Sequence, residues 1–559
     1  MANTKRSDLG FRMKILSGAA VLALTAGQAF ALPAGAPQNS GATPTIQDFV
    51  KAHSDNSSWI LTGKGYDNNR YVADSTITPD NVKGLKPVWT FKISDNGPIE
   101  ATPMVWHGTV YVTSAHDHVY AIDAKTGQLK WEFQDNPHVI AFAANRGVAL
   151  LDGKVYIATL DGRLVALDAE TGKTVFDVVD VADTTNSFYT MAPIPYHNPT
   201  TGKDELLLGV ANGDWGGLGN ISAFDPQTGR RIWQFNTVPG PGEKGHNTWS
   251  GDSWKQGGAA VWTQMGIDPQ TGMLYANAGN PQPDFNGPAR LGANLYSNSL
   301  LALNISGATP KLVWYHQFIA HDTHDWDPTM PPLLFTGTVH GQSMQLVADG
   351  DKAGNFWLLN SATGQLVNHL QVSMQYNQNS EPSLKGNTAC PNTNGGVEFN
   401  GGSYDPQTNM VYLPSSNECG YWHATKNVVY IAGQFYLGGA FPTFVGPSTG
   451  QLNAINVDTG VFAWRYHDKL PMAAGALSTG SGVVFTGLLN NDFAAFDAKT
   501  GQKLWSYNTG SPIIAPPVLF TEDGTDYVAV ASGPAGNQQL PEMSTSNAGT
   551  MLTMFAVSH

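Results

Sequence analysis

The segment "HDTHDWD" at 321–327 contains the densest group of titratable side chains in the sequence. Only 13% of the chain is charged, yet this segment holds three acids and two histidines: Asp322, Asp325, Asp327, His321 and His324. Residues two apart in extended backbone point to the same side, so the carboxylates of Asp325 and Asp327 are expected to lie side by side. Adjacent carboxylates need a cation or a shared proton. The segment therefore predicts a site for a hard cation with oxygen ligands.

Two other interpretations of this segment stay open at the level of the residues. The histidines are separated by two residues, which would allow a zinc ion, although this spacing on a loop is a weak zinc signal. A solvated acidic loop would need no ligand, but Trp326 in its middle argues against full exposure. The scaffold that holds the loop therefore decides between them.

A recurring phrase indicates what that scaffold is. It consists of apolar residues, Asp or Asn, two or three further residues, Thr-Gly, and a strand that contains an aromatic residue. The clearest copies are VYAIDAKTGQLKWEF (119–133), LVALDAETGKTVFDV (165–179), ISAFDPQTGRRIWQF (221–235), LNAINVDTGVFAWRY (452–466) and FAAFDAKTGQKLWSY (493–507). Each copy predicts a β-hairpin in which Gly supplies the positive φ of the turn. The aromatic residue is expected to pack against the neighbouring repeat.

Radial repetition of such hairpins predicts an all-β fold, an eight-bladed β-propeller of four-stranded antiparallel sheets over residues 58–559. About 500 residues at about 60 residues per repeat give about eight blades. No persistent helical periodicity appears after residue 40. An array of β-sandwiches is the alternative, but it would not produce a common Asp-Thr-Gly-Trp phrase. Long polar loops such as 316–335 and 375–400 are expected to carry the function.

The N-terminus has the pattern of a secretory signal peptide. Basic residues precede the apolar run ILSGAAVLALTAGQAFA, which ends in the small-x-small sequence Ala29-Phe30-Ala31. We therefore expect residues 1–31 to be a signal peptide, residues 32–57 to be an N-terminal extension, and the protein to be periplasmic. A membrane anchor is the alternative, although the run is short for a span. No later segment is long and apolar enough to be transmembrane.

Charge and cysteine content restrict the partners further. The formal net charge of −14 disfavours nucleic acid and anionic membranes as partners, and it is compatible with a cationic protein. The chain has two cysteines, Cys390 and Cys419, and an even count in an exported protein predicts one disulfide. Two free thiols are the alternative. No C-x-x-C-H sequence occurs, so we expect no covalent c-type haem.

Three further segments occur in a specific order with the repeats and the acidic loop. They are SSWILTGKGYDNNRYV (57–72), NAGNPQP (277–283) and ANLYSNSLLALN (293–304). In this order the motifs resemble the quinoprotein alcohol dehydrogenases, eight-bladed propellers that bind pyrroloquinoline quinone (PQQ) and a metal ion. The resemblance extends from about Trp59 to about Gly533. It implies a dehydrogenase without a haem domain that oxidises an alcohol to an aldehyde or ketone by hydride transfer to metal-bound PQQ.

The resemblance also implies roles for the acidic loop. Asp325 matches the family's catalytic base, which accepts the hydroxyl proton of the alcohol. The implied metal ligands are Asp214, Asn280, Asp325 and Asp327. Asp327 resembles the additional carboxylate of lanthanide-using members, and three negative charges suit a trivalent ion, so a lanthanide is favoured over calcium. Asp214 departs from the pattern, because the family has the longer Glu at that position.

Contacts to PQQ are implied in the same way. Trp262 lies 18 residues before Asn280, which is the spacing of the family's stacking Trp. Arg146 matches an Arg that binds a PQQ carboxylate, and Lys352 matches the cation that polarises the quinone oxygens. The remaining implied contacts are Glu100, Thr190, Asn212 and Gly213.

Three further places depart from the family pattern. Ile140 and Ala141 stand where the family has adjacent cysteines over the quinone, so we expect apolar side chains such as Phe142 to cover it. His324 replaces a Trp, and we expect this change to alter the pocket wall. Glu398 replaces an Asn. A carboxylate beside a polyanionic cofactor is costly unless it is protonated or paired, so Glu398 is left out of the expected site.

The implied partners are a small-molecule alcohol and a separate cytochrome c or similar electron acceptor. The oligomeric state is left open, with a homodimer among the options. A non-catalytic scaffold of the outer-membrane assembly type is one alternative function, since such propellers carry similar repeats. A PQQ dehydrogenase for sugars or polyols is another, because the departures favour an altered pocket. For the same reason methanol is not the favoured substrate.

Overall fold

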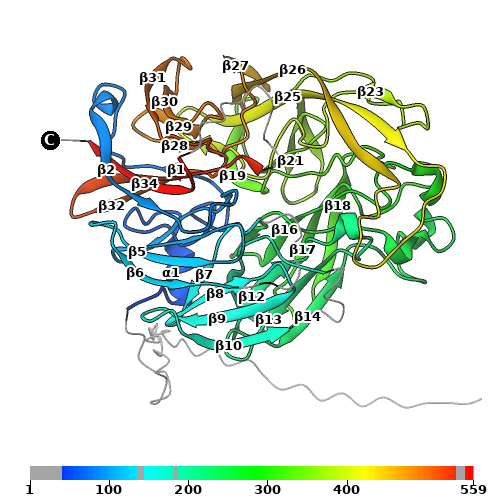
Figure 1. Ribbon diagram of the computed structural model, residues 1–559, viewed down its shortest axis with the longest axis horizontal. Coiled ribbons are helices and arrows are strands. Elements are labelled where there is room, and N and C mark those ends of the chain that lie inside the picture. Colours follow the sequence, from blue (N-terminus) through cyan, green and yellow to red (C-terminus); the bar gives the residue numbers. More distant parts are fainter. Residues whose placement is uncertain (1–40, 136, 138–143, 180–186, 537–547, 558–559) are drawn as a thin grey trace, which may run out of the picture. The chain divides into compact units, whose positions relative to one another are not determined.

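The structure is a computed structural model that describes residues 41–135, 137, 144–179, 187–536 and 548–557. The expected signal peptide lies outside the described residues, as do Ile140, Ala141 and Phe142. The described residues form eight β-sheets of four or five strands, antiparallel except for one short parallel pair (Figure 1). The prediction of an all-β, eight-bladed propeller is therefore confirmed.

Five blades are each built from four strands that follow one another in the sequence. In chain order these blades are β3 (Met104–Trp106), β4 (Thr109–Thr113), β5 (Val119–Asp123) and β6 (Leu129–Phe133); β7 (Ala149–Leu151), β8 (Lys154–Ala158), β9 (Arg163–Asp168) and β10 (Thr174–Val179); β11 (Ile194–Asn198), β12 (Lys203–Gly209), β13 (Asn220–Phe224) and β14 (Arg231–Asn236); β15 (Gly266–Asp268), β16 (Met273–Ala278), β17 (Ser299–Asn304) and β18 (Lys311–Gln317); and β19 (Leu333–Val339), β20 (Gln342–Gly350), β21 (Asn355–Asn360) and β22 (Leu366–Gln371).

Two further blades carry an additional strand. One consists of β24 (Ser403–Asp405), β25 (Met410–Ala424), β26 (Gly439–Asn456) and β27 (Val461–Asp468), with β23 (Asn387–Ala389) pairing along the second half of β25. The other consists of β28 (Leu477–Thr479), β29 (Val483–Gly487), β30 (Asp492–Asp497) and β31 (Lys503–Asn508), with β1 (Tyr71–Val72) parallel to β28. The β25–β26 hairpin contains the two longest strands of the described residues.

The eighth blade combines strands from both ends of the sequence. Three of its strands are β32 (Val518–Glu522), β33 (Thr525–Ser532) and β34 (Met551–Val557), and the fourth is β2 (Leu85–Lys92). Figure 1 shows β2 in blue beside β34 in red, and the two pair antiparallel with Phe91 opposite Leu552. This pairing closes the propeller, because it joins β2, near the start of the described residues, to the last strand, β34.

The repeated Asp-Thr-Gly phrase forms the turn before the outermost strand of a blade. Between β5 and β6, Asp123 Oδ1 accepts hydrogen bonds from the N–H (3.0 Å) and the hydroxyl (2.9 Å) of Thr126. Gly127 follows with φ +69°, and a Cβ there would lie 2.7 Å from the ring of Trp89 in the adjacent blade. Trp89 Nε1 donates to the carbonyl of Ala124 (2.8 Å). The same contact recurs for Trp131 on Gly172, Trp314 on Gly364 and Trp464 on Gly501. Each Trp therefore packs on the turn of the next blade, as the repeat predicted.

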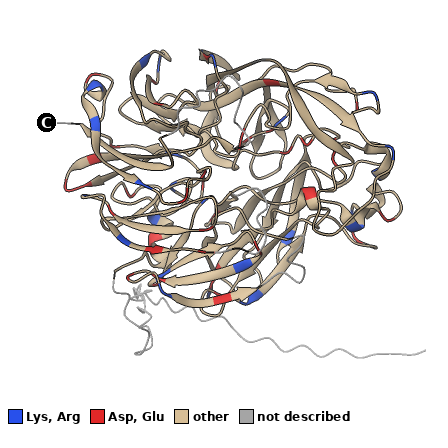
Figure 2. Ribbon diagram, in the orientation of Figure 1, with Lys and Arg blue, Asp and Glu red and all other residues tan. Residues whose placement is uncertain are grey.

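Burial changes from the innermost strand of a blade to the outermost. All three residues of β7 are buried, whereas β27 alternates exposed and half-buried residues. Figure 2 shows Lys, Arg, Asp and Glu as separated positions along the ribbon. Charged side chains are expected on solvent-facing strands, so any that lie in the middle of the molecule need a partner or a function.

One α-helix lies in the expected N-terminal extension. In α1 (Ile46–Lys51) the Asp48 carboxylate accepts hydrogen bonds from both the N–H and the hydroxyl of Thr45, each 2.8 Å. This helix was not predicted from the sequence, since six residues are too few for a periodic pattern. The short 3-10 helices are η1 (Val82–Gly84), η2 (Gly213–Trp215), η3 (His246–Thr248), η4 (Ser253–Gln256) and η5 (Gly287–Arg290). Among the described residues, none of the helices has the length and apolarity needed to cross a membrane.

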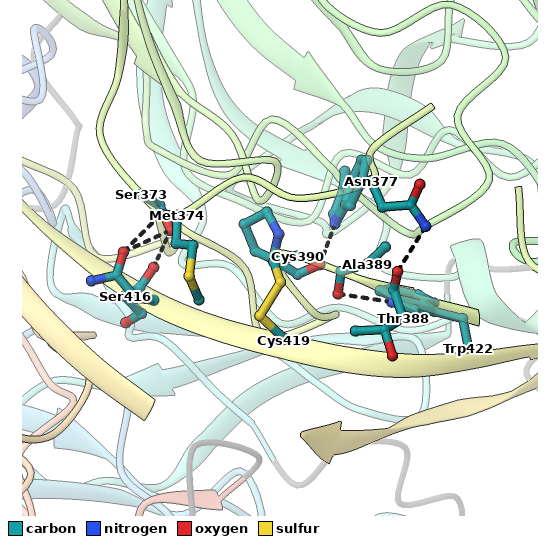
Figure 3. Close-up of a disulfide and its surroundings, with 12 residues drawn as sticks. Ser373, Met374, Asn377, Thr388, Ala389, Cys390, Ser416, Cys419 and Trp422 are labelled. Carbon is teal, nitrogen blue, oxygen red and sulfur yellow. Dashed lines mark hydrogen bonds between the residues drawn. A yellow bond between two sulfur atoms is a disulfide. The ribbon is translucent and has the colours of Figure 1, made fainter. Parts of the chain in front are cut away.

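The two cysteines form the predicted disulfide, Cys390–Cys419, across a sequence separation of 29 residues (Figure 3). It fixes the segment that follows β23 to the middle of β25. Cys390 N also donates to the carbonyl of Tyr376 (2.9 Å), and Tyr376 N donates back to Cys390 (3.1 Å). In the chain-entropy account, a cross-link over a loop of this size stabilises the fold by about 3–4 kcal/mol.

Candidate active site

Most of the predicted site residues lie on two kinds of loop. One kind leads into the innermost strand of a blade: Glu100 precedes β3, Arg146 precedes β7, Thr190 precedes β11, Trp262 precedes β15, and Asp325 and Asp327 precede β19. The other kind joins the second and third strands: Gly213 and Asp214 between β12 and β13, Asn280 between β16 and β17, and Lys352 between β20 and β21. In an antiparallel four-stranded blade both kinds of loop are at the same end. Residues far apart in sequence are therefore brought to one end of the propeller.

These residues surround one cavity of about 300 Å³. Among the described residues, its lining includes Glu100, Arg146, Thr190, Gly213, Asp214, Trp262, Asn280, Asp325, Asp327 and Lys352. Asn212 is the predicted residue that is not part of the lining; it is buried beside Gly213, and its Nδ2 donates to the carbonyl of Leu218 (3.1 Å). The structure thus collects the predicted residues, while the chemical role of each stays a prediction.

A group of acids forms one end of the cavity. Lys352 Nζ lies 3.1 Å from Asp325 Oδ1 and 2.9 Å from Asp327 Oδ2. Asp327 Oδ1 accepts the N–H of Asn280, so the acidic loop and the Gly-Asn-Pro turn are joined directly. Both aspartates are buried, which excludes the solvated acidic loop as an interpretation.

The backbone of the acidic loop explains which carboxylates face the cavity. Asp322 Oδ1 accepts the N–H of His324 (3.0 Å), and Asp322 Oδ2 accepts the N–H of Trp326 (2.8 Å). Asp322 therefore holds the loop rather than lining the cavity. Asp325 has φ +57°, in the left-handed region that costs a non-glycine residue roughly 1 kcal/mol or more. This conformation is held by the hydrogen bonds around it, and it presents Asp325 to Lys352.

His324, which replaces the family's Trp, lies behind the acidic loop. It is not among the residues that line the cavity, and it stacks on Trp326 with ring centroids 4.2 Å apart and an interplanar angle of 11°. Its ring also meets the edge of Trp422 at 4.9 Å. Burial lowers its pKa to about 3, so the ring is neutral. The expected change in the pocket wall stays a prediction, and the ring itself fills an aromatic cluster behind the loop.

Burial dominates the electrostatics of the acidic end. It raises the pKa of Asp325 well above the usual range, against the opposing attraction of Lys352. It raises the pKa of Asp214 to about 6, again opposed by Lys352. Both shifts mean that the ionised carboxylates lack the stabilisation that water would give. A cation placed among them would supply it.

The opposite end of the cavity is aromatic and cationic. The guanidinium carbon of Arg146 lies 4.9 Å from the ring centroid of Trp262 and 4.2 Å from that of Phe399. Thr190 holds the two backbones together, because its carbonyl accepts the N–H of Arg146 (2.9 Å) and its hydroxyl donates to the carbonyl of Trp262 (3.3 Å). Lys352 Nζ is 5.6 Å from the Trp262 ring, so it lies between this end and the acids.

Two carboxylates also belong to the aromatic end. Glu100 forms an ion pair with Arg146 at 2.8 Å. Burial raises the pKa of Glu398 to about 8, with Lys352 opposing the shift and Glu100 adding to it. At neutral pH Glu398 is therefore mostly uncharged. The cavity lining does include Glu398, although the sequence analysis left it out.

Several other residues of this region were not predicted from the sequence. Asp284 is buried four residues past Asn280, and its Oδ1 accepts Asn280 Nδ2 (2.7 Å). Phe399, Phe441 and Phe444 line the cavity from the blade that contains β25 and β26. An acid only four residues past Asn280 could have indicated that Asp284 belongs to the site. Nothing in the sequence marked the phenylalanines: Phe441 and Phe444 lie on β26 of the long β25–β26 hairpin, and Phe399 lies on the segment before β24.

Comparison with known proteins agrees with this geometry. Residues 59–374 match the family described as the glucose/ethanol/alcohol dehydrogenase β-propeller domain, and residues 421–535 match that of outer membrane protein assembly factor BamB. Over 524 residues the chain is 32% identical to quinoprotein alcohol dehydrogenase PedH of Pseudomonas putida, covering 85% of this chain and 86% of the relative. It is 30% identical to the lanthanide-dependent methanol dehydrogenase of Methylacidiphilum fumariolicum, covering 88% and 87%.

The chain belongs to the family of PQQ-dependent alcohol dehydrogenases. Among solved structures, a europium-containing methanol dehydrogenase superposes with a TM-score of 0.80 at 28% identity, covering 91% of this chain and 100% of that one. A quinohaemoprotein alcohol dehydrogenase from Comamonas testosteroni superposes with a TM-score of 0.84 at 27% identity, covering 93% and 83%. The resemblance recognised from the motifs is thus confirmed, and the protein is an oxidoreductase of the quinoprotein class.

The residues of this quinoprotein fit a flat polyanion such as PQQ. Trp262 and Phe399 supply aromatic surface, and Arg146 and Lys352 supply positive charge. Arg146 Nε and Nη1 are buried without a hydrogen-bond partner among the described residues. Buried donors of this kind are costly unless a ligand accepts from them, and a carboxylate is the matching acceptor.

The acidic end of the quinoprotein fits a hard cation by the chemistry of its donors. Three carboxylates and the amide of Asn280 line the same part of the cavity. Within the described residues, no three His, Cys, Asp or Glu side chains are close enough together to hold a metal ion on their own. Lys352 is instead the cation between Asp325 and Asp327, so metal binding would require these side chains to close around the ion.

Proposed function

We propose that this protein oxidises an alcohol to an aldehyde or ketone, with PQQ held by Trp262, Arg146 and Lys352 and with a metal ion held by Asp214, Asn280, Asp325 and Asp327. The observation that carries the proposal is the single cavity with buried cationic donors on aromatic surface at one end and oxygen ligands at the other. When bound, PQQ supplies two-electron oxidation and the metal supplies a Lewis acid. Family membership supports the redox class.

Asp325 is the proposed general base for the hydroxyl proton. It borders the cavity, and Lys352 donates to its Oδ1 at 3.1 Å. Burial strengthens the carboxylate as a base by raising its pKa, while the Lys352 ammonium favours the ionised form that can accept a proton. The two effects together suit a group that must be ionised before the reaction and protonated after the proton transfer.

The proposed metal is a lanthanide ion in preference to calcium. Asp214, Asp325 and Asp327 are all buried at the cavity, and trivalent ions gain more than divalent ions from each additional carboxylate. The lanthanide-dependent and europium-containing relatives support this preference. Asp214 is shorter than Glu, so the ion would lie closer to the backbone of η2, or a water molecule would complete the contact.

The substrate, electron acceptor and cellular location belong to the same proposal. The phenylalanines at the cavity, Phe399, Phe441 and Phe444, favour an alcohol with an apolar substituent over methanol or a sugar. Electrons would leave to a separate cytochrome c or similar carrier, and the N-terminal sequence pattern supports export to the periplasm. The match of 421–535 to an assembly factor leaves a scaffold as the alternative function, but a scaffold does not need buried, unpartnered Arg146 donors.

Reconstitution tests the proposal directly. The purified protein is stripped of cofactor and metal, then supplied with PQQ, with Ca²⁺ or La³⁺, or with both, and dye-linked oxidation of a panel of alcohols is measured. We expect turnover only with PQQ and a metal together, and faster turnover with La³⁺. Turnover without PQQ would contradict the cofactor, and equal turnover without any metal would contradict the cation.

One variant refines the choice of metal. Asp327→Ala should reduce La³⁺-supported turnover more than Ca²⁺-supported turnover, because it removes one negative charge from the acidic end. Glu205→Gln is a matched control, since Glu205 is a buried acid on β12 that accepts from Trp233 Nε1 (3.1 Å) and lies outside the cavity lining. Equal losses with both ions would contradict the lanthanide preference.

A further inference from the structure

A fourth carboxylate lies behind the acidic end of the cavity. Asp284 is 1% exposed, between Pro283 and Phe285 on the segment that follows the Gly-Asn-Pro turn. Its Oδ1 accepts hydrogen bonds from Asn280 Nδ2 (2.7 Å) and from Gln282 Nε2. Its Oδ2 is buried without a hydrogen-bond partner among the described residues. Burial raises the pKa of Asp284 well above its usual range, so the ionised carboxylate needs a compensating positive charge nearby.

Asp284 is connected to two of the proposed metal ligands. By accepting from Nδ2 of Asn280, it leaves the amide oxygen of Asn280 as the atom available to a cation. Gln282 Nε2 also lies 3.5 Å from Asp214 Oδ1, so one amide bridges the carboxylates of Asp214 and Asp284. Two ligands that come from different loops are therefore oriented through a single buried acid.

Charge counting distinguishes a divalent from a trivalent ion. Lys352 pairs with Asp325 and Asp327, so these two acids, Asp214 and Lys352 carry a combined charge of −2 when ionised, which a divalent ion neutralises. With ionised Asp284 the combined charge becomes −3, which a trivalent ion neutralises. Like charges in a buried site repel strongly. The ionised state of all four acids therefore requires a cation close both to Asp284 and to the three acids at the cavity.

Arg290 supplies a positive charge to the same region, and its hydrogen bonds go to other groups than the Asp284 carboxylate. Its guanidinium donates to the carbonyls of Pro283 (3.0 Å), Asp284 (3.1 Å) and Asp322, and to the side chain of Asn294 (2.9 Å). None of these bonds reaches the Asp284 carboxylate. Burial lowers the pKa of Arg290, and the buried carboxylates of Asp322 and Asp284 both attract its charge. Arg290 therefore fixes the backbone around Asp284 and attracts its charge, but it donates no hydrogen bond to the Asp284 carboxylate.

We propose that Asp284 is a positioning residue of the metal site, which orients Asn280 and supplies the fourth negative charge that makes the site prefer a trivalent over a divalent cation. This inference rests on the proposed metal site and extends it to a residue outside the cavity lining. Outer groups that accept hydrogen bonds from a ligand commonly change metal affinity by 10- to 100-fold, about the size of effect expected here.

Metal affinity, not turnover, is the test. The PQQ-loaded protein is titrated with Tb³⁺, followed by Trp-sensitised luminescence, and then with Ca²⁺ as competitor. Asp284→Asn keeps the shape and the acceptor for Asn280 but removes the charge. We expect it to lower the affinity for Tb³⁺ about tenfold or more and to lower that for Ca²⁺ less, so that the Tb³⁺/Ca²⁺ preference falls. An unchanged preference would overturn the inference.

Two further variants keep the test decisive. Asp284→Glu retains the charge, so it should lose less of the Tb³⁺ preference than Asp284→Asn, and equal losses would overturn the charge argument. Glu205→Gln is the buried-acid control and should leave the preference unchanged; a fall there equal to that of Asp284→Asn would also overturn the inference. If the wild-type protein takes up neither ion with PQQ, the proposed metal site itself fails, which is a separate outcome.

Discussion

Aspartates have different roles in the blade turns and in the cavity. Asp123 in the turn after β5 is 35% exposed at its side chain, and Asp325 at the cavity is 8% exposed. Burial raises the pKa of Asp123, but the hydrogen bonds from Thr126 and the charge of Lys130 together outweigh it, so the net pKa is lowered. Burial raises the pKa of Asp325 with far less compensation. In the turns the carboxylate accepts hydrogen bonds from the adjacent backbone and Thr hydroxyl. In the cavity the carboxylate is available to bind a cation or a proton.

This difference shows how one fold separates stability from chemistry. The turns repeat around the propeller, so each is expected to contribute a small and similar amount to the free energy of unfolding. The cavity residues come from the connecting loops, and few of them repeat. Substitutions in the cavity loops should therefore have large effects on turnover, and substitutions in the blade turns should have small effects on stability.

The largest effect is expected for Asp325→Asn. The amide keeps the size of the side chain but cannot accept the hydroxyl proton, so turnover should fall about 10²- to 10⁴-fold. The measurement is dye-linked alcohol oxidation by the PQQ- and metal-loaded protein, with bound PQQ checked by its absorption. Retention of more than about a tenth of the activity at full PQQ occupancy would mean that another group is the base.

The second effect concerns the contact between blades. Trp464 Nε1 donates to the carbonyl of Ala498 (2.9 Å), and its ring covers Gly501 of the next blade. Trp464→Ala should lower the free energy of unfolding by about 3 kcal/mol, measured by urea denaturation. Trp464→Phe keeps ring contact and should cost less.

Val461→Ala on the same strand is the control for this contact, because Val461 is 54% exposed and should change stability by about 0.5 kcal/mol or less. If Trp464→Ala were no worse than Val461→Ala, the Trp-on-Gly contact would not be what joins neighbouring blades.

The sequence predicted the scaffold well because the scaffold is local and repeated. The Asp-Thr-Gly turn needs a few adjacent residues, and the Trp that packs on Gly127 or Gly501 has the same place in each copy. The number of blades and the disulfide followed from counting. The short helix α1 was missed because it depends on one bond pair between Thr45 and Asp48.

The site could be predicted only in part. Spacing and family resemblance placed Trp262, Asn280 and Asp325 at one cavity, because motif order carries that information. The resemblance could not place His324, whose ring turns toward Trp326 and Trp422. It could not reveal Asp284 either, since an acid behind a ligand is recognised only from its contacts.

A smaller effect tests the aromatic end of the cavity. Glu398 has a folded-state pKa of about 8, above its ordinary value of 4.5. Its contribution to stability is thus fully present below about pH 4.5 and is lost as the pH rises through about 8. Above that pH the carboxylate is ionised beside the polyanion, so PQQ affinity should fall up to tenfold per pH unit.

Glu398→Gln removes this titration, so the contribution of Glu398 to the pH dependence can be distinguished from that of neighbouring groups. PQQ affinity is measured by fluorescence titration from about pH 6 to about pH 9, and the variant should show a flatter dependence. Glu100, whose pKa burial also raises, faces the same space, so its titration would persist in the variant. An identical pH dependence in both proteins would assign the effect to Glu100 rather than to Glu398.

The smallest effect is expected in the turns, and it completes the comparison. Asp123→Asn is the same chemical change as Asp325→Asn, but the amide oxygen can still accept from Thr126, so the loss of unfolding free energy should be about 0.5 kcal/mol and turnover should be unchanged. Asp123→Ala removes the acceptor and should cost about 1 kcal/mol. If Asp123→Asn reduced turnover as strongly as Asp325→Asn, the separation between stabilising turns and reactive loops would be wrong. A carboxylate that water solvates can be replaced with little loss of stability. A buried carboxylate is destabilising, so it is expected only where its charge has a function.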